Sequence, residues 1–220
     1  MKRWRILGLA VLCGAFVASV PAGADTFTGS LVYDTGLDAT ESWADSDYPT
    51  TLSWVVSENA NGSWNYQYTF DTPGPGISHW IIELTDPVQD GDLFSFSGDF
   101  SATETQTHTA GPGNPHMPED VYGIKFEWDN GGDAETISFD SSRLPVWQDT
   151  YIKCGGNVNT AWNLGFTSGD SDPTNAPADG TIDNHILAPN GYVPEPATTV
   201  LFGIGLAGIV GRKLRRRRED

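Results

Sequence analysis

Carboxylates grouped in loops are the residues of this sequence that best fit a chemical task. Four short acidic clusters stand among turn-forming residues, at 45–47, 90–92, 129–133 and 170–172. Carboxylate oxygens are the ligands that Ca²⁺ prefers, although no cluster completes the twelve-residue EF-hand loop. We expect a calcium site first at Asp129 and Asp133, because Gly131 and Gly132 let the backbone turn around an ion. The alternative is that these aspartates are ordinary turn residues.

Hydrolytic chemistry has less support from the residue spacing. The four histidines show no HExxH-type zinc pattern, and the sequence has neither a Gly-x-Ser-x-Gly elbow nor a phosphate-binding glycine loop. Glycoside hydrolysis needs only two carboxylates about 5–9 Å apart, which a chain this acidic offers by chance. The nominal candidates, each also explained as a solvated side chain, are Glu83, Glu104, Glu119 and Glu127. We expect a protein that is not an enzyme, with a secreted glycan-active hydrolase as the alternative.

Aromatic and arginine side chains suggest a binding role instead. Arg143 and Trp147 flank Pro145, and both residue types are frequent at the centre of binding interfaces. This stretch is therefore a candidate ligand loop; the alternative is a buried tryptophan beside a structural arginine ion pair. Tryptophans that could stack on sugar rings, if exposed, are Trp43, Trp80, Trp147 and Trp162.

The elements that must position these residues are strands, because apolar residues in the middle of the chain recur with a period of two. Alternating runs at 52–56 and 64–70 lie on either side of Asn61-Gly62, which predicts a hairpin with a tight turn. Further strands are expected at 77–84, 93–100, 121–128, 135–139, 146–153 and 161–166. Turn-forming clusters separate them, and no stretch predicts an amphipathic helix. The sequence thus predicts an all-β fold, an antiparallel β-sandwich of jelly-roll-like form.

The predicted domain, residues 25–192, is strongly acidic. It holds 26 acidic and three basic residues, which leaves a net charge of −23. Such a field disfavours nucleic acid and anionic membrane surfaces as partners and favours cations or neutral glycans. Cys154 is its only cysteine, so we expect no internal disulfide and a buried thiol. Calcium is the one cofactor for which the sequence provides candidate ligands.

Residues 1–24 have the pattern of a secretory signal peptide. Basic residues up to Arg5 precede an apolar run at 6–20, and Ala22 and Ala24 form the small-x-small site that signal peptidase accepts. The run of about 15 apolar residues is shorter than the ~20 of a membrane span. We therefore expect secretion, followed by cleavage after Ala24.

Residues 193–220 have three parts in a fixed order. The first is the motif Val193, Pro194, Glu195 and Pro196; then come an apolar run at 197–211 and the basic cluster Arg212, Lys213, Arg215, Arg216, Arg217 and Arg218. The prolines keep the motif extended and accessible. The apolar run predicts a transmembrane helix, and the basic cluster is expected to stay in the cytoplasm. Fifteen helical residues cover about 22 Å, which suits transient retention better than a permanent span.

This tail resembles the PEP-CTERM sorting signal of Gram-negative bacteria that make exopolysaccharide. The resemblance implies recognition by exosortase, a transpeptidase-like membrane protease, near Pro194 to Pro196. It also implies an exported protein, tethered to the inner membrane and then passed to the cell surface or matrix. We therefore expect a structural or adhesive role in biofilm, with exopolysaccharide as a partner. The alternative is an ordinary tail anchor, because Gly203, Ala207 and Gly211 could form a helix-packing face.

Overall fold

A computed structural model describes residues 24–85, 88–156, 158–169 and 171–190. Within these ranges the chain forms β-strands and one 3₁₀ turn, η1 (Glu41–Trp43). The strands are β1 (Thr26–Val32), β2 (Leu37–Ala39), β3 (Thr51–Glu58), β4 (Trp64–Asp71), β5 (Ile77–Glu83), β6 (Leu93–Ser97), β7 (Ala102–His108), β8 (Val121–Glu127), β9 (Ala134–Ser141), β10 (Pro145–Gln148), β11 (Thr150–Cys154), β12 (Thr160–Asn163) and β13 (Ile186–Pro189). The predicted all-β class is confirmed.

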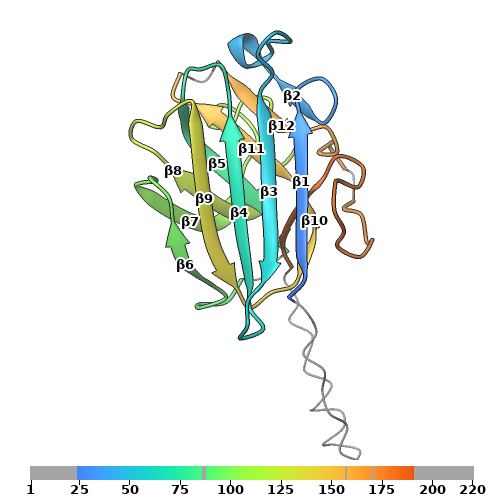
Figure 1. Cartoon of the computed structure of the whole chain (residues 1–220). Coiled ribbons are helices and arrows are strands. Elements are labelled where there is room, and N and C mark those ends of the chain that lie inside the picture. Colours follow the sequence, from blue (N-terminus) through green and yellow to red (C-terminus); the bar gives the residue numbers. More distant parts are fainter. Residues whose placement is uncertain (1–23, 86–87, 157, 170, 191–220) are drawn as a thin grey trace, which may run out of the picture.

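Two antiparallel sheets lie face to face (Figure 1). One has the strand order β1-β3-β4-β9-β6, and the other has the order β2-β12-β11-β5-β8-β7. A two-stranded sheet of β10 and β13 accompanies them. The chain crosses between the two large sheets at β1–β2, β2–β3, β4–β5, β5–β6, β6–β7 and β8–β9. The predicted antiparallel sandwich is therefore confirmed, and these crossings give it its jelly-roll-like character.

Aromatic side chains from both sheets meet in the core between them. The Tyr68 and Trp80 rings lie 6.0 Å apart across the interface, and the rings of Phe126 and Phe139 lie 5.9 Å apart. All four residues are completely buried. Each follows from strand alternation, because every second side chain of a strand points to the same face. Cys154 is also buried, as expected for a small apolar residue.

The Asn61-Gly62 hairpin forms between β3 and β4, which pair in register from Thr51 with Asp71 to Glu58 with Trp64. Only Gly62 has a positive φ, at 83°, so the loop is not the two-residue turn in which both central residues are left-handed. The Asn61 side chain accepts the Ser63 backbone N–H at 3.0 Å and thereby closes the loop.

Several strand boundaries differ from the sequence prediction. The run 146–153 is two strands: β10 pairs with β13, whereas β11 pairs with β5 and β12, and Asp149 lies at the break. The run 93–100 ends at Ser97, because Ser95 has a φ of 55° and the register with β9 shifts.

The prediction also missed β1, β2, β7 and β13. In β7 every residue except His108 is exposed, so this strand has almost no apolar face from which to recognise it. In β13 every residue is buried, so its four residues show no alternation. Apolar and polar residues alternate only where one face of a strand is buried and the other is exposed to solvent.

Both ends of the chain that the sequence singles out fall largely outside the described residues. Ala24 is exposed, whereas Ala22, the motif at 193–196 and the basic cluster at 212–218 are not described. No helix in the described ranges is long and apolar enough to cross a membrane, and the span predicted at 197–211 lies outside them.

Candidate functional site

In the described part of the chain, the cluster of side chains that best fits a ligand-binding site lies at the break between β10 and β11. Asp149 occupies the break and is 3% exposed, and His185, which directly precedes β13, is equally buried. Asp172 comes from the long loop before β13 and is half-buried. One ligating atom from each of the three side chains lies within 4.8 Å of the other two.

The imidazole of His185 faces both carboxylates. Its Nε2 lies 3.4 Å from Asp149 Oδ1 and 4.0 Å from Asp172 Oδ1. Its Nδ1 lies 3.2 Å from the carbonyl oxygen of Ile182. Because a carbonyl oxygen can only accept, Nδ1 is the donor in that hydrogen bond. Nε2 is therefore the nitrogen turned toward the carboxylates.

Neighbouring amides orient the two carboxylates. Asn163 Nδ2 donates to Asp149 Oδ1 at 2.7 Å, and Gln148 Nε2 donates to Asp172 Oδ2. The backbone N–H of Asp149 donates to Glu83 Oε2 at 3.0 Å, which ties the break to the end of β5. Hydrogen bonds from neighbouring residues thus fix the orientation of both carboxylates, as at preorganised binding sites.

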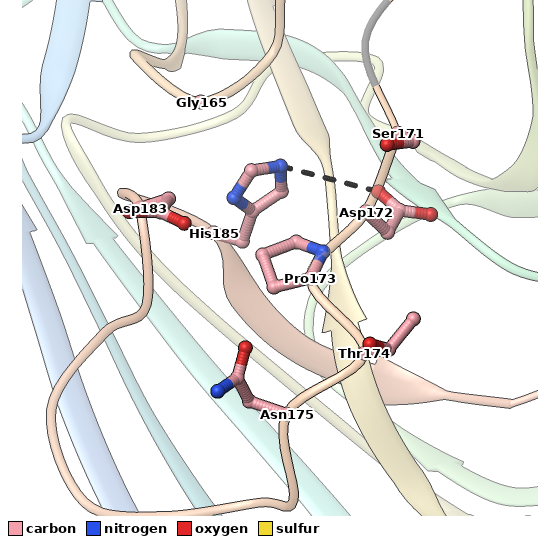
Figure 2. Close-up of a pocket in the computed structure, with 8 residues that line it drawn as sticks. All are labelled: Gly165, Ser171, Asp172, Pro173, Thr174, Asn175, Asp183 and His185. Atoms are coloured by element: carbon pink, nitrogen blue, oxygen red, sulfur yellow. Dashed lines mark ion pairs between the residues drawn. The ribbon is translucent and has the colours of Figure 1, made fainter.

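A surface hollow of about 510 Å³ borders this cluster, in the size range of small-molecule pockets. Figure 2 shows the His185 ring pointing across it toward Asp172, with Pro173 below the line that joins them. Gly165 forms one wall, and a Cβ there would lie 2.5 Å from His185 Cε1. Glycine is therefore required at this position, because any side chain would displace the imidazole.

A second hollow, of about 380 Å³, lies where β3 begins and β4 ends. Tyr48 stands over it with 73% of its surface exposed, the most of any large apolar residue in the described ranges. Asp47, Asp71 and Thr51 add carboxylate and hydroxyl groups to its wall. An exposed aromatic ring beside hydrogen-bonding oxygens suits a neutral polar ligand, because such a ring has an apolar face and a polar end.

Arg143 and Trp147, the candidate ligand loop, are both buried. Arg143 is 1% exposed; its Nε and Nη2 donate to Asp92 Oδ2, and its Nη1 donates to the carbonyl oxygens of Thr85 and Asn190. Burial alone raises the pKa of Asp92, but the hydrogen bonds from Arg143, Gln89 and Ser142, together with the charge of Arg143, outweigh it and lower that pKa. Of the two interpretations, the geometry fits the structural ion pair and not the ligand loop, because neither side chain reaches solvent.

The calcium candidates Asp129 and Asp133 are both exposed. Gly131 has a packing role: a Cβ on it would lie 2.2 Å from the Ile77 carbonyl oxygen. The requirement for glycine there is therefore explained by two backbones in close approach. Calcium binding by this pair stays a prediction.

Three of the four tryptophans proposed to stack on sugars are inaccessible. Trp43, Trp80 and Trp147 are each 0% exposed, because they pack in the main hydrophobic core. The fourth, Trp162, is half-buried and stacks on His116. These three tryptophans therefore cannot stack on a sugar, and Tyr48 is the most exposed aromatic residue in the described ranges.

The four nominal catalytic glutamates do not gather in a cleft. Glu104 and Glu127 share Lys125, at 3.1 Å and 2.8 Å, while Glu119 accepts the Gly169 backbone N–H at 2.8 Å. Neither hollow is lined by any of the four.

Sequence reasoning found only one member of the His185 cluster. Asp172 belongs to the acidic loop 170–172, but Asp149 looked like an interior residue of a single long strand. His185 has no metal-type spacing to another histidine. A signal was nevertheless present, since Gln148-Asp149 places two polar residues between apolar strand segments.

Comparison with known proteins identifies one part of the chain. Residues 193–217 match the PEP-CTERM protein-sorting motif. No curated protein and no solved structure gives a significant match. The motif implies recognition by exosortase and an exported protein that is processed at the membrane. By its matched C-terminal motif, this chain is a PEP-CTERM sorting-domain protein.

Proposed function

We propose that the exported domain is a non-enzymatic component of the exopolysaccharide matrix, with a structural or adhesive role at the cell surface. The sorting motif supports the route to that location. The surplus of 23 negative charges in residues 25–192 supports a neutral or cationic partner over an anionic one.

The observation that carries the binding part of this proposal is the Tyr48 hollow. The ring is 73% exposed beside Asp47 and Asp71. A solvent-facing aromatic ring can stack on a sugar, and the carboxylates can accept hydrogen bonds from sugar hydroxyls. We assign contact with a neutral glycan to this hollow.

Binding of the full-length protein, in detergent, to exopolysaccharide purified from the producing cells tests this assignment. We expect Tyr48→Ala to weaken binding at least tenfold, about 1.4 kcal/mol, because the stacking surface is removed. Val55→Thr is the matched control: Val55 is also exposed, at 39%, but it lies on β3 and does not line the hollow. Equal binding by wild type and Tyr48→Ala would refute the assignment.

The matrix role itself is tested in cells. Deletion of the gene should reduce biofilm or floc cohesion, and the Tyr48→Ala allele should restore it less well than wild type. Unchanged cohesion in the deletion strain would count against the role, whatever the purified protein binds.

A further inference from the structure

We propose that Asp149, Asp172 and His185 form a binding site for a divalent transition-metal ion, for which Zn²⁺ is the probe. The site is separate from the Tyr48 hollow, and it goes beyond the matrix role proposed above.

The spacing of the ligand atoms suits such an ion. Zinc binds histidine nitrogen and carboxylate oxygen at about 2.0–2.2 Å, so tetrahedral ligands lie about 3.4 Å from one another. His185 Nε2 lies 3.4 Å from Asp149 Oδ1 and 4.0 Å from Asp172 Oδ1. All three ligating atoms lie within 4.8 Å of one another. To reach the tetrahedral spacing, the distances between these atoms would have to shorten by at most about 1.4 Å.

The outer contacts are those of a metal site. The Nδ1–H of His185 donates to the Ile182 carbonyl oxygen, which directs Nε2, the nitrogen that would bind the metal, to the carboxylates. The amide of Asn163 holds Asp149, and the amide of Gln148 holds Asp172. Contacts of this kind hold the ligands in the orientation that the metal needs, and they thereby raise the affinity for it.

Gln148 supplies an independent observation. It is 4% exposed, and in the described part of the chain its carbonyl oxygen Oε1 has no hydrogen-bond partner. The same amide group donates through Nε2 to Asp172. The oxygen of a buried amide that is itself bonded to Asp172 is a further potential ligand, either for the ion or for a water molecule bound to it.

The ligand types select the class of metal. Ca²⁺ and Mg²⁺ take oxygen ligands, whereas imidazole suits zinc, copper, iron and nickel. Two carboxylates around one divalent ion also balance its charge, which offsets the cost of burying them close together. The site thus differs in metal class from the calcium predicted at Asp129 and Asp133.

The hollow beside the cluster gives the ion a means of contact with solvent. His185 and Asp172 line it, together with Ser171, Thr174 and Asn175. Three protein ligands with coordination positions open to a hollow are typical of a metal that binds a further small ligand. Gly165 maintains this arrangement, since a side chain there would fill the space beside the ring.

Zinc titration of the metal-stripped full-length protein in detergent, with bound metal measured after dialysis, tests the proposal. We expect one zinc ion per chain in the wild type and at least tenfold weaker binding in Asp172→Asn, a variant that keeps the size of the side chain. Calcium at the same concentration should not displace the zinc. His185→Gln should lose binding as well, with retention of the β-sheet circular dichroism spectrum as evidence of folding.

Asp183→Asn is the matched control, since it removes the same charge from the same hollow outside the cluster. Asp183 is exposed and has a φ of 47°, a conformation that asparagine tolerates well. This variant should bind zinc like the wild type. The proposal is overturned if the wild type binds no zinc, if Asp172→Asn binds it as tightly, or if Asp183→Asn loses as much affinity.

Discussion

Two buried charged groups lie on either side of strand β10 and differ in how their charge is balanced. Arg143, before the strand, meets one carboxylate and two backbone carbonyl oxygens. Asp149, after the strand, meets a second carboxylate and an imidazole. The first arrangement is complete, because one guanidinium neutralises one carboxylate. The second has a surplus of carboxylate and borders a hollow.

The difference separates a stabilising element from a candidate binding site. A buried ion pair with satisfied hydrogen bonds has no capacity left for a ligand, so its effect is on stability and on the arrangement of the chain. Two carboxylates held close together keep a capacity for a cation. Burial alone would not distinguish Arg143 from Asp149; the signs of the neighbouring charges do.

The largest expected effect comes from breaking the complete pair. Arg143→Met should lower the free energy of unfolding by about 3–5 kcal/mol, because Asp92 loses its partner while it remains largely buried. Urea denaturation of the protein measures this loss. The double variant Arg143→Met, Asp92→Asn should recover part of the stability, since it removes the unpaired charge. A single variant as stable as wild type would show that the pair contributes nothing.

An intermediate effect is expected at a histidine that lacks the two carboxylates of the His185 cluster. Burial, and then the charge of Lys153, lowers the pKa of His79 from 6.5 to about 4. The folded state therefore binds a proton less readily than the unfolded state between these values. The resulting stability is fully present above pH 6.5 and is lost as the pH falls toward 4, by up to about 3 kcal/mol.

His79→Gln should therefore make the stability less dependent on pH in this window. Unfolding free energies at pH 7 and pH 4.5, compared between wild type and variant, isolate this contribution from that of the carboxylates. If the unfolding free energy changed equally between these two pH values in both proteins, the pH dependence would not come from His79.

The smallest effect is expected at the exposed counterpart of the Arg143 pair. Lys125 bridges Glu104 on β7 and Glu127 on β8, whose side chains are 48% and 45% exposed. Burial alone lowers the pKa of Lys125, but its hydrogen bonds to the two glutamates, together with their negative charges, outweigh it and raise that pKa. Lys125→Met should cost no more than about 1 kcal/mol, and less at high salt, because water screens the pair. If Lys125→Met lowered the free energy of unfolding as much as Arg143→Met does, burial could not explain why the two ion pairs differ.

Much of the sandwich could be predicted because alternation is a local property. Tyr68 and Phe126 each have a polar neighbour on either side, so each marks a strand with one buried face. The same reasoning failed for β7, which is exposed on nearly all its residues, and for β13, which is buried on all of them. It also could not tell whether the tryptophans are exposed, because alternation identifies a shared face without saying which side of the sheet meets the core.

The sequence alone determined the strand-forming runs, the acidic charge of the domain and the sorting motif, because each depends on residue type and order within a short segment. Only the tertiary structure decided that Asp149 interrupts a strand run and that Asp172 and His185 meet it there. Asp149 lies at the break between β10 and β11, whereas Asp172 and His185 lie on the connection between β12 and β13, and their meeting depends on how β10 pairs with β13 while β11 joins another sheet. Such long-range pairing has no periodic signature, so no local pattern could have predicted it.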